Sequence, residues 1–293
     1  MAKKSSRSGS NKHYPVQRVF RLAEESPQSN NQDMQIRIDH NLSMVNHRLY
    51  RQSRVYKVKV DLDANAPDQI GVDVYALNDT WMNQKAYQFA KEIFDRNSQE
   101  ELAMGVKKAR WNDFRVNHGV TCADLQPVLE NGATAAAVLN TGEFPPTVIT
   151  NASGNERQLQ WVGSGAASFN IIDQYDLTAN TDAAPDTPIT AVAYDGMQDE
   201  VDDAQVEHLQ TDGDLPPYDA TSIENRVFTR IARLVVDQDG TSKLSTGFFN
   251  APCGLIWLKG IDAASTSVTL DKLLTCTVQG GDYKGVHAPS YLE

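Results

Sequence analysis

The stretch from residue 55 to residue 76 constrains the fold more than any other part of the chain, because apolar and polar residues alternate in it twice. The apolar positions of Val55–Leu62 are Tyr56, Val58, Val60 and Leu62. A period of two places alternate side chains on opposite faces of a strand, so this stretch predicts a strand with one buried face. Turn-forming residues fill 63–68, and the alternation resumes in Ile70–Ala76. We predict that the two strands form a long antiparallel pair.

The hydrophobic period then changes to about 3.6, which predicts a helical insertion over residues 78–106. Three consecutive residues that can act as N-caps, 78–80, precede it. The apolar residues expected to share the face that packs on the sheet are Met82, Ala86, Phe89, Ala90 and Ile93. Ser98 and Glu101 have capping-box spacing, which predicts a second short helix closed by Gly105.

The last third of the chain returns to strand patterns. The stretches expected to form strands are 157–162, 227–236, 247–260 and 267–279. For 227–236 a helix stays possible, because Arg226, Arg230 and Arg233 have spacings that also suit one, but the composition favours a strand. About eight to ten strands joined by turns and long loops, without alternating crossover helices, favour an antiparallel sandwich or jelly roll over a parallel sheet. We therefore predict an all-β fold, a single antiparallel jelly roll (an eight-stranded β-sandwich) formed by residues 17–293.

The N-terminal stretch is basic and too polar to fold by itself. Six basic residues precede the first acidic residue, Glu24: Lys3, Lys4, Arg7, Lys12, Arg18 and Arg21. The residues between them are rich in Ser, Gly and Asn, which predicts a disordered arm over residues 1–16. We expect disorder to extend to residue 21 in the isolated subunit, and these six residues to bind nucleic acid. The basic excess continues, with twelve Lys and Arg against four Asp and Glu in the first 59 residues.

The acidic residues are concentrated in one region. No Lys or Arg lies between Arg157 and Arg226, while residues 173–224 hold fourteen Asp and Glu. The rest of the chain has a net charge of +3, although the whole chain has −11. We predict long acidic surface loops over residues 173–223. The simplest interpretation of these loops is a solvated face, and the alternative is a cation site or a partner surface.

Several chemistries have no support in the sequence. The three cysteines are widely spaced and the six histidines are scattered, so we expect free thiols and no metal site. Phosphate-binding loops, nucleophile elbows and zinc-protease motifs are missing, so we expect neither an enzyme nor a cofactor. The longest apolar runs fall far short of the roughly 20 residues that a membrane span needs, so we expect no membrane partner.

Five stretches, which together cover roughly half the chain, resemble a known family. They are the basic arm Lys3–Lys12, the strand Val55–Leu62, the helical segment from Thr80 to Phe94, the run Ala109–Val116 and the strand Asn250–Ile256. This combination resembles the single-jelly-roll capsid proteins of small circular, Rep-encoding single-stranded DNA viruses. The arm is shorter and less rich in arginine than is usual in that family, and the overall charge is more acidic.

The resemblance implies a viral capsid protein that self-assembles into an icosahedral shell and packages a single-stranded DNA genome through its basic arm. Its location would be the virion, and the host nucleus or cytoplasm during assembly. Its partners would be copies of itself and single-stranded nucleic acid, bound without sequence preference. Possible additional basic contacts are Arg48, Arg51, Arg54, Lys107, Lys108 and Arg110.

Other functions stay open at this point. A non-viral β-sandwich binding module, lectin-like or adhesive, would explain the strands and the acidic loops but not the basic arm, and it predicts a monomer or small oligomer. A hydrolase on the same scaffold would need converging histidines and carboxylates, which the sequence does not display. The arm itself could serve as a solubility tail or a nuclear-targeting signal.

Overall fold

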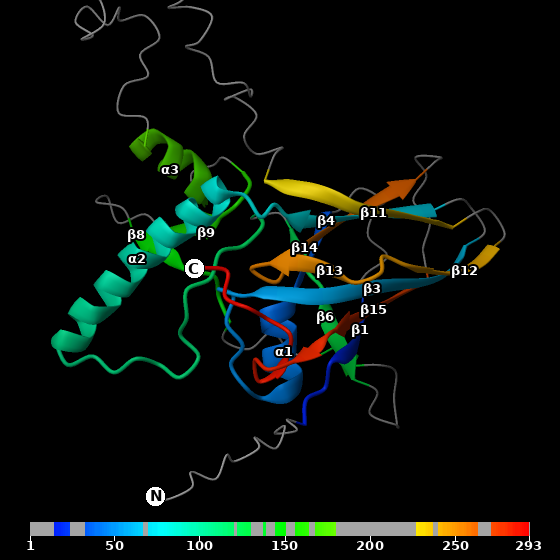
Figure 1. Cartoon of the computed structure of the whole chain (residues 1–293), viewed down its shortest axis with the longest axis horizontal. Helices are drawn as coiled ribbons and strands as arrows, with labels where there is room; N and C mark the ends of the chain where they lie inside the picture. Colours follow the sequence, from blue (N-terminus) through cyan, green and yellow to red (C-terminus); the bar gives the residue numbers. More distant parts are fainter. Residues whose placement is uncertain are drawn as a thin grey trace, which may run out of the picture.

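The computed structural model describes residues 15–23, 33–66, 70–119, 122–129, 137–138, 144–150, 156–163, 168–179, 227–236, 240–262 and 271–292. Strands dominate this part of the chain, nearly all of them antiparallel, and three helices accompany them (Figure 1). The predicted all-β class is confirmed. None of the helices in the described ranges is long and apolar enough to cross a membrane.

The first large sheet is entirely antiparallel. Its strand order is β12 (Gly240–Ser245), β3 (Val55–Ala66), β15 (Asp271–Val278), β1 (Val19–Ala23), β6 (Gln126–Leu129) and β7 (Ala137–Val138). A further strand, β13 (Phe249–Pro252), continues along the same edge of β3 beyond β12. The strands predicted over 227–236, 247–260 and 267–279 are confirmed in this sheet and in the next one.

The second large sheet has five strands. Its order is β11 (Phe228–Val236), β4 (Ile70–Leu77), β14 (Leu255–Asp262), β2 (Asp33–Arg37) and β5 (Ala123–Asp124). Only β5 runs parallel to its neighbour. Strands β5, β6 and β7 come from the same part of the chain, so one long connection supplies the edge strand β7 to the first sheet and the edge strand β5 to the second.

The two sheets share one hydrophobic core. Val58, Val60 and Cys276 from the first sheet belong to the same buried cluster as Ile36 and Leu258 from the second. The alternation in β3 predicts its faces correctly, because the apolar positions are buried while the lysines and the aspartate between them are partly exposed. Burial of this cluster between the sheets holds them together.

The predicted pairing of β3 with β4 is wrong. β3 pairs with β12, β13 and β15, while β4 pairs with β11 and β14 in the other sheet. Alternation places the apolar face of a strand toward the core, but it does not say whether the next strand lies beside it or across the core. Here the two strands lie on opposite sides of the core.

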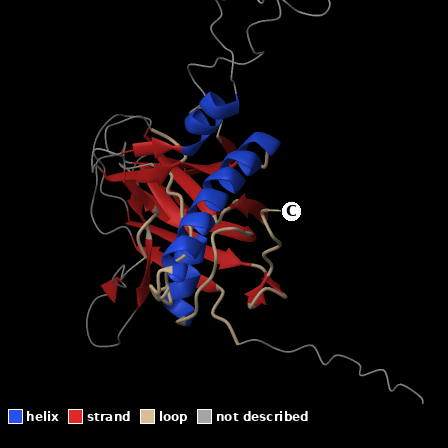
Figure 2. Ribbon diagram, turned by 90° about the vertical axis from the view of Figure 1, so that its left-hand side faces the viewer, coloured by secondary structure: helices blue, strands red, loops and turns tan. Residues whose placement is uncertain are grey.

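The connection between β4 and β11 is a large insertion with its own hydrophobic core. It contains α2 (Trp81–Ala103), α3 (Ile171–Ala179) and a small sheet of β8 (Val148–Thr150), β9 (Glu156–Gln160) and β10 (Ser168–Asn170). Its buried side chains include Tyr87, Phe114, Trp161 and Ile172, which pack with Tyr291 near the C-terminus. Figure 2 shows α2 crossing in front of the strands on this side of the molecule.

The helix α2 lies within the predicted insertion but differs from the prediction in two ways. It runs through Ser98 as one helix, so the second helix predicted there does not form separately. Thr80 caps its start, and Gly105, with φ +89°, follows its end as expected. Its buried face carries Ala86 and Tyr87, while the Phe89 and Ile93 side chains are each 42% exposed. The apolar residues of α2 are spread over two sides of the helix, and only one of these sides packs against the small core of the insertion.

The remaining predictions have mixed outcomes. Helix α3 occupies the start of the predicted acidic loops, and residues 180–226 lie outside the described ranges. All three cysteines are free, with Cys253 and Cys276 buried and Cys122 partly exposed. The sequence did not predict α1 (Ile38–Asn46) or the small hairpin of β16 (Gly280–Gly281) and β17 (Gly285–Val286).

Candidate nucleic-acid interface

Only two of the six basic residues predicted to bind nucleic acid lie in the described part of the chain. Lys3, Lys4, Arg7 and Lys12 lie outside it. Arg18 and Arg21 are exposed, and Arg21 stands on β1, opposite Thr275 of β15. The prediction that disorder extends to residue 21 is therefore wrong for residues 18–21. Phe20 and Leu22 are buried in the shared core, and their burial orders β1 despite its basic neighbours.

Three of the additional basic residues predicted from the sequence gather at one place. Arg48, Arg51 and Arg54 follow α1, and the fold brings them to the hairpin of β16 and β17, which carries Tyr283 and Lys284. We call the set formed by these five residues and Tyr50 the basic-aromatic cluster.

Direct contacts hold the cluster together. The Arg54 guanidinium lies over the Tyr283 ring, 4.3 Å from its centroid, and the Lys284 ammonium is 5.2 Å from the same centroid. These distances allow cation–π attraction. The Tyr283 hydroxyl accepts a hydrogen bond from the backbone N–H of Arg51 at 3.3 Å. The partly exposed Tyr283 ring is thus held close to two cations.

The base of the cluster is rigid. Tyr50 is fully buried, its hydroxyl donates to the carbonyl of Lys284 at 3.0 Å, and its ring packs edge-on against Tyr283. The Lys284 ammonium donates to the carbonyl of Leu49. Lys284 and Gly285 both have positive φ, so the hairpin turns tightly and presents Tyr283 and Lys284 side by side.

The groups around Lys284 disfavour its charged form. Partial burial lowers the pKa of Lys284, and the neighbouring Arg48 and Arg51 guanidiniums lower this pKa further. Nearby cations make the protonated form of Lys284 less favourable, and an approaching anion stabilises that form. The arrangement can therefore bind phosphate or carboxylate groups.

The start of the described chain lies beside the cluster. The backbone N–H of Gln17 donates to the Asn46 side chain at the end of α1, and the Arg18 carbonyl accepts from Val278. The Arg18 guanidinium lies directly against Gly280, at the base of the hairpin that carries Tyr283. Figure 1 shows the dark blue start of the described chain close to α1 and the red C-terminal segment.

The other three predicted basic residues do not join the cluster. Lys107, Lys108 and Arg110 are exposed on the segment that follows α2. Their described contacts are local, since Lys108 lies over the ring of Phe94 and Arg110 over the ring of Trp111.

Sequence reasoning missed Tyr283 and Lys284. The run Asp282–Gly285 contains an aromatic and a basic residue in a tight turn, which is the only local signal. Its proximity to Arg51 arises from contacts between residues more than 230 positions apart. A basic run near residue 50 was therefore visible in the sequence, but its aromatic partner was not.

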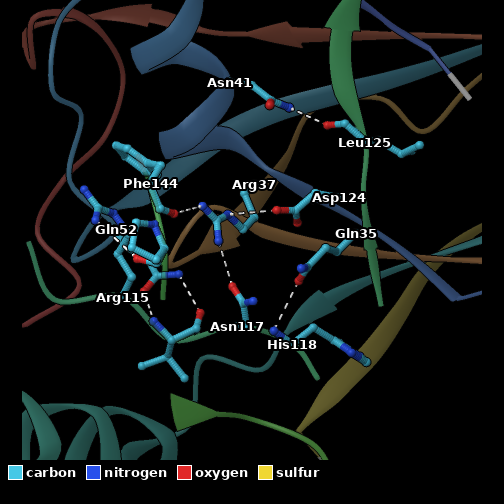
Figure 3. Close-up of polar contacts among 12 residues, drawn as sticks. Gln35, Arg37, Asn41, Gln52, Arg115, Asn117, His118, Asp124, Leu125 and Phe144 are labelled. Atoms are coloured by element: carbon cyan, nitrogen blue, oxygen red, sulfur yellow. Dashed lines mark hydrogen bonds and ion pairs between the residues drawn. The ribbon is translucent and has the colours of Figure 1, made fainter. Parts of the chain in front are cut away.

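A second polar cluster is buried beneath the insertion (Figure 3). Arg37 donates to the Asn117 side chain at 2.8 Å and to the Phe144 carbonyl at 2.9 Å, and it lies 3.8 Å from an Asp124 oxygen. The Phe144 ring lies between the His40 ring, 4.5 Å away, and the Arg115 guanidinium, 3.5 Å away.

This buried cluster perturbs two titratable groups. Burial raises the pKa of the Asp39 carboxyl from 3.8 to about 6, although Arg37 and Arg115 oppose the shift. Burial lowers the pKa of His118 to about 4, so its ring is neutral at pH 7. The backbone N–H of His118 donates to the Gln35 side chain.

The buried cluster has a structural role. Gln52 donates to and accepts from the backbone of Val116, both at 2.7 Å, so it mimics a strand neighbour for the inserted segment. The Arg37, Asp39 and Arg115 side chains are at most 3% exposed. These residues fasten the insertion to α1 and β2, and they offer no surface to a large ligand.

Comparison with known protein families, curated proteins and solved structures finds no match for this chain. Its function has to be inferred from its strand order and from the basic-aromatic cluster.

Proposed function

We propose that this chain is the subunit of an icosahedral viral capsid, built on a single jelly roll, which packages a single-stranded DNA genome. The observation that carries the proposal is the nesting of the strand pairs. β1 pairs with β15, β2 with β14, β3 with β12, and β4 with β11. The first strand of the eight thus pairs with the last, the second with the seventh, and so on inward.

Nesting of this kind is what a long antiparallel hairpin produces when it is rolled into two facing sheets. The pairs belong alternately to the first and the second sheet, and β3–β15 and β4–β14 contacts complete each four-stranded set. The resulting orders, β1-β15-β3-β12 and β2-β14-β4-β11, agree with an eight-stranded jelly roll. Viral capsid and lectin domains both use this fold, so a further observation has to separate them.

The charge distribution favours the capsid over a lectin-like module. The basic N-terminal stretch is continuous with β1, and its described residues Gln17 and Arg18 lie at the end of α1 and against the hairpin of the basic-aromatic cluster, so basic groups from two parts of the chain come together. Lys and Arg bind phosphates by releasing counterions, without any need for sequence. A module that binds neutral carbohydrates does not need such a concentration of positive charge.

Purification of the full-length recombinant chain, followed by negative-stain microscopy and light scattering over a range of salt concentrations, tests the proposal. We expect closed particles of uniform size that contain nucleic acid protected from nuclease. A monomer or small oligomer at every salt and protein concentration would contradict the capsid function and favour the binding module.

A further inference from the structure

We infer that the basic-aromatic cluster is a second nucleic-acid site on the folded body, which binds phosphates and one base of a single strand. The inference rests on the proposed packaging function and extends it, because it assigns part of the binding to the folded domain. Arg48, Arg51, Arg54 and Lys284 would contact phosphates, and Tyr283 would stack with a base.

Three cations of the cluster keep their charge for a ligand. Among the described residues, Arg51, Arg54 and Lys284 form no ion pair with a carboxylate. Asp282 is exposed two positions before Lys284, and Asp113 is near enough to raise the pKa of Lys284. Within the described part of the chain, these two carboxylates do not neutralise the three cations, so the surface keeps a positive charge for a polyanion.

The aromatic member indicates which polyanion fits. Tyr283 is partly exposed and its hydroxyl is held by Arg51, so its ring has a fixed position beside the cations. A single strand offers unpaired bases that stack on such rings, whereas a duplex hides them. An acidic protein segment offers charge without a planar ring. The combination of fixed tyrosine and clustered cations therefore fits single-stranded nucleic acid best.

The position of the cluster gives the site a place in packaging. The basic stretch reaches the folded body at Gln17 and Arg18, which contact the end of α1 and the hairpin of β16 and β17. A strand held by that stretch would therefore meet the cluster next. The site would fix the path of the nucleic acid where it first touches the shell domain.

The test compares two double variants of the full-length protein that remove equal charge. Arg48→Gln with Arg51→Gln removes two exposed cations from the cluster, and Lys85→Gln with Lys259→Gln removes two exposed cations that were not predicted to contact nucleic acid. Affinity for a labelled thymidine oligonucleotide is measured against salt concentration by fluorescence anisotropy. We expect the cluster variant to flatten the slope of log K against log salt by about 1.4, from about 0.7 per phosphate contact, and the control to leave it unchanged.

Tyr283 provides an independent measurement. Loss of stacking in Tyr283→Leu should lower affinity between about 5-fold and about 150-fold, while Tyr283→Phe should retain it. Equal slopes in wild type and cluster variant would overturn the inference while leaving the capsid proposal intact. An equal loss in both double variants would also overturn it, because only total charge would then matter. A wild-type protein that neither binds the oligonucleotide nor assembles would refute both proposals together, whereas a protein that binds without assembling would contradict only the capsid proposal.

Discussion

Asp39 is a carboxyl group placed where water cannot solvate it. It is fully buried, and no side chain in the described structure donates a hydrogen bond to its carboxylate. Burial raises its pKa to about 6 against 3.8 in the ordinary state. The folded state therefore binds this proton more tightly than the unfolded state does. The contribution of Asp39 to stability is most favourable below pH 4 and is lost as the pH rises to 6.

Asp39→Asn should consequently stabilise the protein at neutral pH. A shift of about two pKa units corresponds to about 3 kcal/mol, which we expect as the gain in the free energy of unfolding at pH 7. The gain should shrink toward pH 4, where both residues are neutral. Urea denaturation at pH 4 to 7 measures the effect. Asp95→Asn, at an exposed carboxylate, serves as control, and a loss of stability at pH 7 would show that Arg37 and Arg115 compensate the buried charge fully.

Gly254 is required by both its backbone and its surroundings. Its φ is +63°, and a Cβ there would lie 3.0 Å from the Tyr56 ring and 3.3 Å from Ile38. Gly247 has a φ of +69° with nothing within 4 Å of such a Cβ, so it isolates the backbone cost. Gly247→Ala should lose about 1–2 kcal/mol of unfolding free energy. Gly254→Ala should lose about 1–3 kcal/mol more, because a tight core cannot accept the methyl group.

Chemical denaturation of the two glycine variants under the same conditions gives the difference. Similar losses in the two variants would mean that the core around Tyr56 yields to the extra methyl group.

Helix α2 shows how an element can be predicted while its orientation is not. Tyr87 is fully buried against Phe114, Trp161 and Tyr291, whereas Phe89 is 42% exposed and contacts Tyr175. Tyr87→Ala should therefore reduce the free energy of unfolding by about 3–5 kcal/mol. Phe89→Ala should cost less than about 2 kcal/mol, since much of its ring stays in water. Urea denaturation measures both losses. A larger loss for Phe89→Ala than for Tyr87→Ala would mean that the face predicted from the apolar spacing is the buried one.

Elements with a long, regular pattern could be predicted from the sequence, and those without one could not. The alternation in β3 identified both the strand and its buried face. The pattern of β11 was ambiguous, because its arginine spacing also suits a helix, and only its composition favoured a strand. Strands β5, β7, β8 and β10 have two or three residues each, too few to show a period. The pairing of β3 and β4 was wrong because alternation defines a face and not a neighbour.

At the scale of the whole molecule, the candidate site combines what was visible in the sequence with what was not. Arg48, Arg51 and Arg54 lie within seven residues of one another and were predicted as possible basic contacts. Tyr283 and Lys284 reach them only because β15 and its following hairpin return to β3 and α1. A site made by segments that are far apart in the chain leaves no local pattern in the sequence.

The nested strand order also determines when the protein can fold. β15 lies between β1 and β3, and β14 lies between β2 and β4, so each sheet waits for a strand that the ribosome makes long after the neighbours of that strand. Until then the earlier strands keep open edges, which invite aggregation. A chain that stops before β14 and β15 cannot complete either sheet. Synthesis of these two strands therefore acts as a quality control, and we expect chains that lack them to be excluded from the proposed shell.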